Sequence, residues 1–188
     1  MIAPIPEFGF KNRVISRVLI DEKTIAARLE ILAGQITAFY EGKPLTVVAV
    51  LNGSLLFAAD LLRRVPLPLR LDCLSVASYH GGMQSSGVVT FLQNHLPELR
   101  GRHVLLLDDI LDTGQTLHTV RERLLAEAHP ASLRIAVLLR KRKVLPPGLG
   151  RVEADWVGFE IEDEFVVGYG LDYEGEYRNY PFIGVLEK

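Results

Sequence analysis

The stretch VLLLDDILDTGQTL, residues 104–117, decides the fold of this chain. Its first four residues are all apolar and predict a strand buried on both faces, as in a parallel sheet. Two acids, Asp108 and Asp109, end this apolar run, and a third acid follows at Asp112. A helical pattern then begins, whose apolar residues recur at spacings of three and four: Leu117, Val120, Leu124 and Leu125. A strand, an acidic loop and a helix are therefore expected in this order.

Such a loop places a ligand at the carboxyl end of the strand, beside the backbone amides that begin the helix. Amides and threonine hydroxyls at a helix N-terminus attract phosphate. Carboxylates repel phosphate, but they accept hydrogen bonds from sugar hydroxyls or bind Mg²⁺. A phosphorylated sugar satisfies both halves of the loop. For Asp112 alone, an ordinary helix N-cap is the simpler interpretation, but three acids followed by Thr-Gly-x-Thr favour a binding site.

The composition is that of an ordinary globular protein and excludes several functional classes. The 188 residues are 48% hydrophobic and 23% charged, and we expect one domain over residues 1–188. Because 21 basic residues nearly balance 23 acidic ones, neither nucleic acid nor a membrane is an expected partner. The single Cys73 is typical of a reducing cytoplasm, and the five histidines show no zinc-like spacing.

Strands and helices alternate along the predicted chain, which favours an α/β fold with a parallel sheet. Hydrophobic patterns predict strands at residues 18–20, 46–51, 69–78, 88–92, 104–107, 133–139, 155–161 and 182–186, and further helices at 25–39 and 55–62. Asp21 is the expected N-cap of the first helix. Substrates are then expected at the carboxyl ends of the strands.

Three other segments have both a structural and a functional interpretation. Residues 52–54 (Asn-Gly-Ser) form a second strand–glycine–helix turn, which is either an anion site or a tight structural turn. Residues 79–87 are rich in glycine and serine and form either a hairpin loop or a mobile lid. Residues 140–143 (Arg-Lys-Arg-Lys) follow a buried strand, where a basic cluster is usually a solvated turn.

Residues 104–117 resemble the 5-phosphoribosyl-1-pyrophosphate (PRPP) binding motif of the type I phosphoribosyltransferases. Residues 157–161, 165–173 and 177–179 are similar to the hypoxanthine(-guanine) phosphoribosyltransferases, and the resemblance covers residues 18–186. It implies a five-stranded parallel core under a small hood built from both chain ends. It also implies transfer of the phosphoribosyl group from PRPP to a 6-oxopurine in purine salvage, giving IMP or GMP and pyrophosphate. Family members are commonly dimers or tetramers, so a homodimer or homotetramer is expected.

The resemblance assigns the PRPP-binding roles to the loop that follows the central strand. The 5′-phosphate is expected in the cradle formed by Thr113, Gly114, Gln115 and Thr116. Asp108 and Asp109 are expected to bind the ribose hydroxyls, directly or through Mg²⁺. Asp112 is expected at purine N7, as the catalytic proton acceptor or a hydrogen-bond partner.

Pyrophosphate is expected to meet Mg²⁺, the backbone of Asn52 and Gly53, and Arg178. In the family, a non-proline cis peptide often exposes the backbone amide of this loop. Many relatives have lysine where this chain has Asn52, so a backbone role is favoured over a side-chain role. Asp172 resembles the residue that reaches a second Mg²⁺ through water. Ser78 and Tyr79 match the start of the family's flexible catalytic loop; without the family, Arg178 would be taken for a surface residue.

The resemblance also assigns the residues that bind the purine. Lys141 is expected to donate a hydrogen bond to the 6-oxo oxygen, with Lys143 as the alternative, and this favours hypoxanthine or guanine over adenine. Phe165 is expected to stack on the base, and the Val166 backbone to read its edge, although both residues also fit a β-core. Ile110 is expected to pack beneath the base, and Asp172 is also assigned to the purine-binding residues.

Two other functions are alternatives to this enzyme. A PRPP-sensing regulator would keep the fold without catalysis, but such proteins usually carry a DNA-binding module or a basic face. We expect no room for such a module in this single domain, and the net charge of −2 is not positive. An enzyme for another base is the second alternative. Residues 165–172 argue against a pyrimidine, whereas xanthine is compatible with them.

Overall fold

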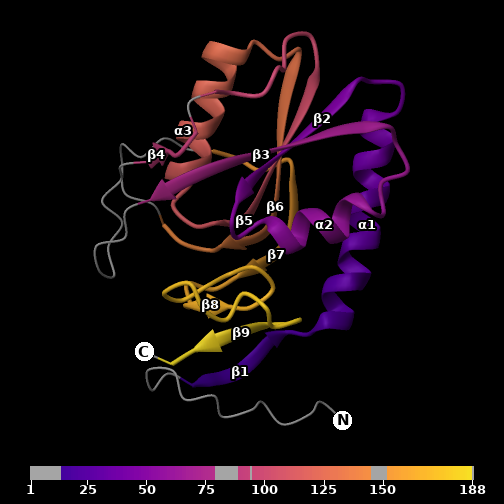
Figure 1. Ribbon diagram of the computed structural model, residues 1–188. Helices are drawn as coiled ribbons and strands as arrows, with labels where there is room; N and C mark the ends of the chain where they lie inside the picture. Colours follow the sequence, from indigo (N-terminus) through magenta and orange to yellow (C-terminus); the bar gives the residue numbers. More distant parts are fainter. Residues whose placement is uncertain (1–13, 79–88, 94, 145–151, 188) are drawn as a thin grey trace.

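The computed structural model describes residues 14–78, 89–93, 95–144 and 152–187. The described residues form two sheets, a large one in the upper part of Figure 1 and a small one below it, which contains the first and last described strands. The strands are β1 (Ile15–Ile20), β2 (Leu45–Leu51), β3 (Leu69–Ser78), β4 (Val89–Phe91), β5 (His103–Leu111), β6 (Ser132–Lys141), β7 (Trp156–Ile161), β8 (Val166–Val167) and β9 (Ile183–Leu186).

The large sheet has the strand order β4-β3-β2-β5-β6-β7. Five neighbouring strands of this sheet, β3, β2, β5, β6 and β7, run parallel to one another. Strand β4 pairs antiparallel with β3 at one edge. The predicted α/β class and five-stranded parallel core are confirmed. The expected strand at 88–92 is present as β4, which pairs with β3 as one arm of a hairpin.

Alternating residues of β5 explain why this strand lies at the centre of the sheet. Leu105 and Leu107 point into the core beneath two helices, whereas Val104 and Leu106 point into the core on the opposite face. All four side chains are fully buried. Successive side chains of a strand point to opposite faces of the sheet, so a strand that is apolar on both faces is fully buried only when other layers cover both faces. This is the arrangement of a parallel sheet with helices on its two sides.

Helices α1 (Glu22–Tyr40) and α2 (Leu55–Leu62) cover one face of the sheet, and α3 (Gln115–Arg123) covers the other (Figure 1). Asp21 caps α1 as predicted, and its carboxylate accepts a 2.8 Å hydrogen bond from the Thr24 amide. No helix among the described residues is both long and apolar enough to cross a membrane.

Three details of the central stretch differ from the sequence-based expectation. Strand β5 does not end before the acids but continues through them to Leu111, because it pairs with β6 over this length. The N-cap of α3 is Gly114 and not Asp112, which is thereby left available for another role. The helical pattern changes to a π-helix at residues 124–128, so Leu124 stays buried while Leu125 is only partly covered.

The small sheet is the expected hood, formed by segments from the two ends of the chain. Its order is β1-β9-β8, and every pairing is antiparallel. Ile15, Val167, Phe182 and Leu186 form its own apolar core. This arrangement holds residues 165–178 over the carboxyl ends of the parallel strands, so the tertiary fold brings the C-terminal motif to the central loop.

Candidate active site

Four chain segments meet at the carboxyl edge of the large sheet. They are the turn after β2, the acidic end of β5 with the following loop, the basic end of β6, and the hood segment at residues 165–178. Contacts among these segments form two groups. One group surrounds Gly53 and Arg178, and the other surrounds Asp112 and Lys141.

Gly53 occupies the tightest point of the site. The preceding Leu51–Asn52 peptide bond is cis, as the resemblance implied. A Cβ at Gly53 would lie 1.7 Å from the Asp109 carboxylate, and a Cβ at Gly170 would lie 2.1 Å from the Gly53 carbonyl oxygen. The Gly53 backbone is therefore held between β5 and the hood, where only glycine permits this approach.

Two adjacent carboxylates, Asp108 and Asp109, end the buried part of β5. Burial raises the pKa of Asp108 well above its ordinary value, and the neighbouring Asp109 charge raises it further. Burial also raises the pKa of Asp109, and the Asp108 side chain, the Ile110 amide and the positive charge of Arg178 act in the opposite direction. This pair is poised to interact with a cation or with hydroxyl donors, because either would relieve the desolvation of its charges.

The loop that follows turns sharply into α3 at Gly114. Gly114 has φ +80°, a conformation that glycine adopts without strain, and it directly precedes the first residue of α3. The Gln115 amide donates a 3.3 Å hydrogen bond to the Thr113 hydroxyl oxygen. Gly114 is buried, and Thr113, Gln115 and Thr116 are half-buried. Residues 113–116 thus place amides and hydroxyls together at a helix N-terminus, where an anion is favoured.

Asp112 lies beside two lysines from the end of β6. The Lys141 ammonium is 3.5 Å from the Asp112 carboxylate and 3.0 Å from that of Asp163, with 11% of its side chain exposed. Lys143 also contacts Asp112. A cavity of about 180 Å³ opens beside this group and is lined by Leu111, Asp112, Thr113, Arg140, Lys141, Lys143, Val152 and Glu153. A proton acceptor and a hydrogen-bond donor therefore share one small space.

Arg178 is half-buried and fixed at three points, so it is not a free surface residue. Its guanidinium donates a 2.5 Å hydrogen bond to the Gly170 carbonyl and pairs with Asp172 at 2.7 Å. Its own carbonyl accepts from the Gly170 amide at 2.9 Å. The second Asp172 oxygen accepts from the Gly175 amide at 2.8 Å. Asp172 therefore orients Arg178, and its remaining lone pairs are left for other partners.

Phe165 and Val166 differ in exposure although they are neighbours. The Phe165 ring is 43% exposed and meets Tyr173 edge to face at 5.7 Å, which leaves a face for stacking. The Val166 side chain is buried in the hood, where Val166 is paired with Val185. The β-core interpretation thus describes the Val166 side chain but does not describe Phe165. Ile110 is partly buried and packs against the core beneath the site.

Sequence reasoning missed three residues of this region. Asp163 pairs with Lys141, and the only signal for it was its position two residues before Phe165. Tyr169 and Asp60 form a hydrogen bond between the hood and α2, although the sequence gives no sign that these residues are close. Of the proposed lid residues, Ser78 ends β3 and pairs with Val89, whereas Tyr79 and the remaining loop lie outside the described residues.

The donor chemistry fits Mg²⁺, provided that the substrate completes its coordination. Among the described residues, no group of three or more histidine, cysteine, aspartate or glutamate side chains is arranged to hold a metal. Mg²⁺ commonly binds through one or two carboxylates together with water and substrate phosphates. Asp108 and Asp109 offer such oxygens next to the Gly53 turn.

Comparisons with known proteins agree with this geometry. The phosphoribosyl transferase domain matches residues 19–174, and the chain belongs to this family. The hypoxanthine-guanine phosphoribosyltransferase of Streptococcus pneumoniae is 43% identical, over 93% of this chain and 94% of that protein. A crystal structure of a hypoxanthine phosphoribosyltransferase from Staphylococcus aureus has a TM-score of 0.84 and 41% identity, covering 92% of both chains. The Trypanosoma cruzi enzyme in complex with the product IMP has a TM-score of 0.82 and 35% identity, with coverage of 92% and 95%.

Proposed function

We propose that this protein transfers the 5-phosphoribosyl group from PRPP to hypoxanthine, and also to guanine, releasing pyrophosphate and forming IMP or GMP. The observation that carries the proposal is the meeting of Asp112 and Lys141 next to the acidic end of β5. A base bound between these side chains would lie next to a phosphosugar held by residues 108–116. The names of the relatives at about two-fifths identity support the same reaction.

In this proposal, residues 113–116 bind the 5′-phosphate, and Asp108 and Asp109 bind the ribose hydroxyls or Mg²⁺. The negative field of these acids favours positive charge on the ribose ring as the bond to pyrophosphate breaks. No protein nucleophile is needed, because the purine nitrogen itself forms the new bond to the sugar. Asp112 accepts the proton or the hydrogen bond of purine N7.

Pyrophosphate leaves toward the Asn52 and Gly53 backbone and Arg178. The planar guanidinium of Arg178 suits a phosphate group, and its two bonds within the hood hold it in place. Asn52 is exposed and has no charge to offer, so its contribution is assigned to the backbone. When bound, Mg²⁺ supplies positive charge that neutralises the oxygens of the leaving group.

Lys141 is the proposed reader of the 6-oxo group, and its pairing with Asp163 and Asp112 supports this role. An ammonium can only donate hydrogen bonds, so it favours a 6-oxo oxygen over the 6-amino group of adenine. Phe165 stacks on the base from the hood, Val166 contributes backbone groups, and Ile110 packs beneath the ring. Asp172 is proposed to reach a second Mg²⁺ through water. Ser78 and Tyr79 are proposed to begin a lid over the site.

The experiment that tests the proposal is an assay of purified protein with PRPP and Mg²⁺ and, in turn, hypoxanthine, guanine, xanthine or adenine. Pyrophosphate release and nucleotide formation are expected with hypoxanthine and guanine and not with adenine. Turnover only with xanthine would correct the substrate. Turnover with none of the four bases, in protein that still binds PRPP, would contradict an enzymatic function and favour a PRPP-sensing regulator.

A further inference from the structure

Tyr169 connects the hood to the helix that follows the Gly53 turn. It is 6% exposed, lies in the left-handed region with φ +50°, and donates a 2.6 Å hydrogen bond to the Asp60 carboxylate. Burial and the Asp60 carboxylate raise the pKa of the Tyr169 hydroxyl, so this group remains a hydrogen-bond donor at neutral pH. None of the roles proposed above uses this bond, although it joins residues 109 positions apart in the chain.

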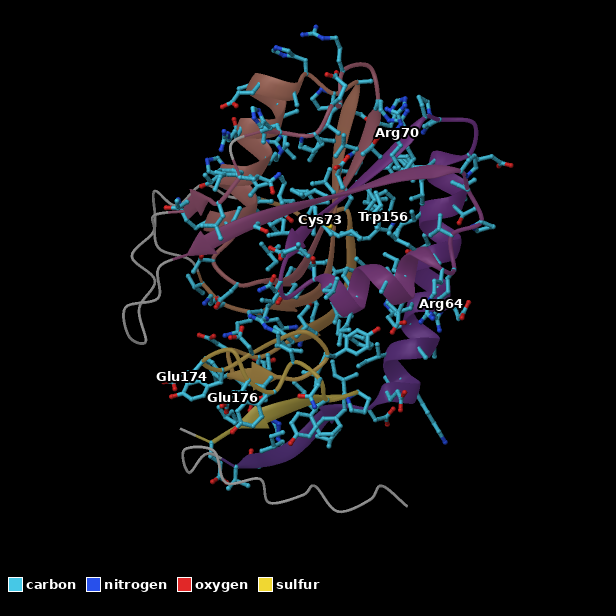
Figure 2. All side chains as sticks on the ribbon, in the orientation of Figure 1. Arg64, Arg70, Cys73, Trp156, Glu174 and Glu176 are labelled. Carbon is cyan, nitrogen blue, oxygen red and sulfur yellow. The ribbon has the colours of Figure 1, made fainter. Side chains whose placement is uncertain are left out.

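Asp60 is itself held firmly on α2. The other oxygen of the Asp60 carboxylate pairs with Arg63 on the same helix. Arg64 donates a 2.8 Å hydrogen bond to the Asp60 backbone carbonyl, and its guanidinium pairs with Glu30 of α1 at 2.7 Å. Figure 2 shows the labelled Arg64 side chain where α2 approaches α1. The acceptor of the Tyr169 bond is thus anchored to the helical layer, and α2 begins two residues after Gly53.

Gly170, the residue after Tyr169, connects this hydrogen bond to the proposed pyrophosphate site. Gly170 packs so closely that an added Cβ would lie 2.1 Å from the Gly53 carbonyl oxygen. Its carbonyl also accepts the 2.5 Å hydrogen bond from Arg178, and its amide donates to the Arg178 carbonyl. Gly170 therefore contacts both groups, so its position affects where the Gly53 backbone lies and how the Arg178 guanidinium is oriented.

We propose that Tyr169 and Asp60 are positioning residues that set the pyrophosphate subsite, by fixing Gly170 against Gly53 and Arg178. This inference rests on the function proposed above and extends it. Lys141, Asp112 and Phe165 have no hydrogen bond or ring contact with this pair, so loss of the bond should affect pyrophosphate and PRPP but leave base binding unchanged. If the bond were merely structural, its loss would lower stability without separating the effect on pyrophosphate and PRPP from the effect on the base.

The test compares Tyr169→Phe and Asp60→Ala with the conservative variant Asp60→Asn, whose amide oxygen can still accept the bond. The matched control is Tyr40→Phe, because Tyr40 is another buried tyrosine whose hydroxyl donates to the Val104 carbonyl at 3.1 Å, away from the site. Binding of pyrophosphate with Mg²⁺ is measured by calorimetry for each folded variant. KM values for PRPP and hypoxanthine are measured alongside.

Loss of a hydrogen bond to a charged acceptor should weaken pyrophosphate binding about tenfold in Tyr169→Phe and Asp60→Ala. KM for PRPP should rise in parallel, KM for hypoxanthine should stay unchanged, and Asp60→Asn should remain close to the wild type. The inference is overturned if Tyr169→Phe binds pyrophosphate normally, if Tyr40→Phe weakens it equally, or if both KM values rise together.

The calorimetric series keeps this inference separate from the proposed function. A wild-type protein that binds pyrophosphate but forms no nucleotide would refute the proposed reaction. Pyrophosphate binding by the variants would still test the positioning role. Normal turnover combined with unaltered pyrophosphate binding in Tyr169→Phe would refute the positioning role alone. A wild-type protein that does not bind pyrophosphate would refute both.

Discussion

Substitution of Gly53 by alanine is expected to disable the site through a defined steric conflict. The new Cβ would lie 1.7 Å from one Asp109 carboxylate oxygen and 2.5 Å from the carboxyl carbon. Ordinary contact begins near 3.4 Å, so the two groups must separate by about 1.7 Å. Gly53 cannot retreat in the other direction, because Gly170 already packs against its carbonyl.

Such overpacking costs about 1–3 kcal/mol of folding free energy. The activity should suffer more, since a displacement of about 1 Å in a binding site can reduce the rate about 100-fold. We therefore expect kcat/KM for PRPP to fall about 100-fold in Gly53→Ala, with the unfolding temperature only a few degrees lower. Pyrophosphate release and thermal unfolding, followed by circular dichroism, measure these two effects.

Gly34→Ala is the matched control. Gly34 lies within α1, and an added Cβ there meets nothing within 4 Å apart from the neighbouring backbone of the helix itself. Alanine should stabilise this helix by about 0.5–1 kcal/mol and leave turnover unchanged. If Gly53→Ala retained turnover within about threefold of the wild type, the steric reasoning from the 1.7 Å approach would be refuted.

Three further predictions concern the charged groups. Asp112→Ala should fold and bind PRPP but lose most turnover, as judged by calorimetry and by product formation; near-normal turnover would contradict its role as proton acceptor. Lys141→Met should raise KM for hypoxanthine about 10- to 100-fold with little change for PRPP, and the same effect in Lys143→Met instead would transfer the role of purine reader to Lys143. The raised pKa of Asp108 means that the folded protein binds its proton more tightly than the unfolded chain, so stability falls as the pH rises from the unfolded pKa through the folded one. Asp108→Asn should therefore unfold at a higher temperature than the wild type at neutral pH, with the gain disappearing below the ordinary value of 3.8; a gain of equal size at both pH values would show that charge is not its source.

Much of the fold follows from local patterns of the sequence. The stretch 104–107 is apolar on both faces of the strand, which predicts that other layers cover both faces of the sheet. In the structure, α1 and α2 cover one face and α3 covers the other. The N-cap at Asp21 was predicted from the same local reasoning. These features depend on side-chain periodicity and on bonds within a few residues, which a single sequence records directly.

Local patterns failed where distant partners decide the outcome. Strand β5 extends beyond the acids because β6 pairs with it, and the change to a π-helix at Leu124 does not follow from the apolar spacing. The acids themselves were found as candidates, but the rise in their pKa values depends on burial by the assembled sheet.

The sequence by itself determined the alternating architecture, the acidic turn before α3 and the resemblance that groups the candidate residues. Only the tertiary structure decided that Gly53 is wedged between Asp109 and Gly170, and that Tyr169 reaches Asp60 across the molecule. The physical reason is the range of the interactions. Periodicity and capping act over a few residues. Close backbone approach and desolvation depend on groups that are distant in the sequence and meet only when the chain is folded, with the hood packed against the sheet.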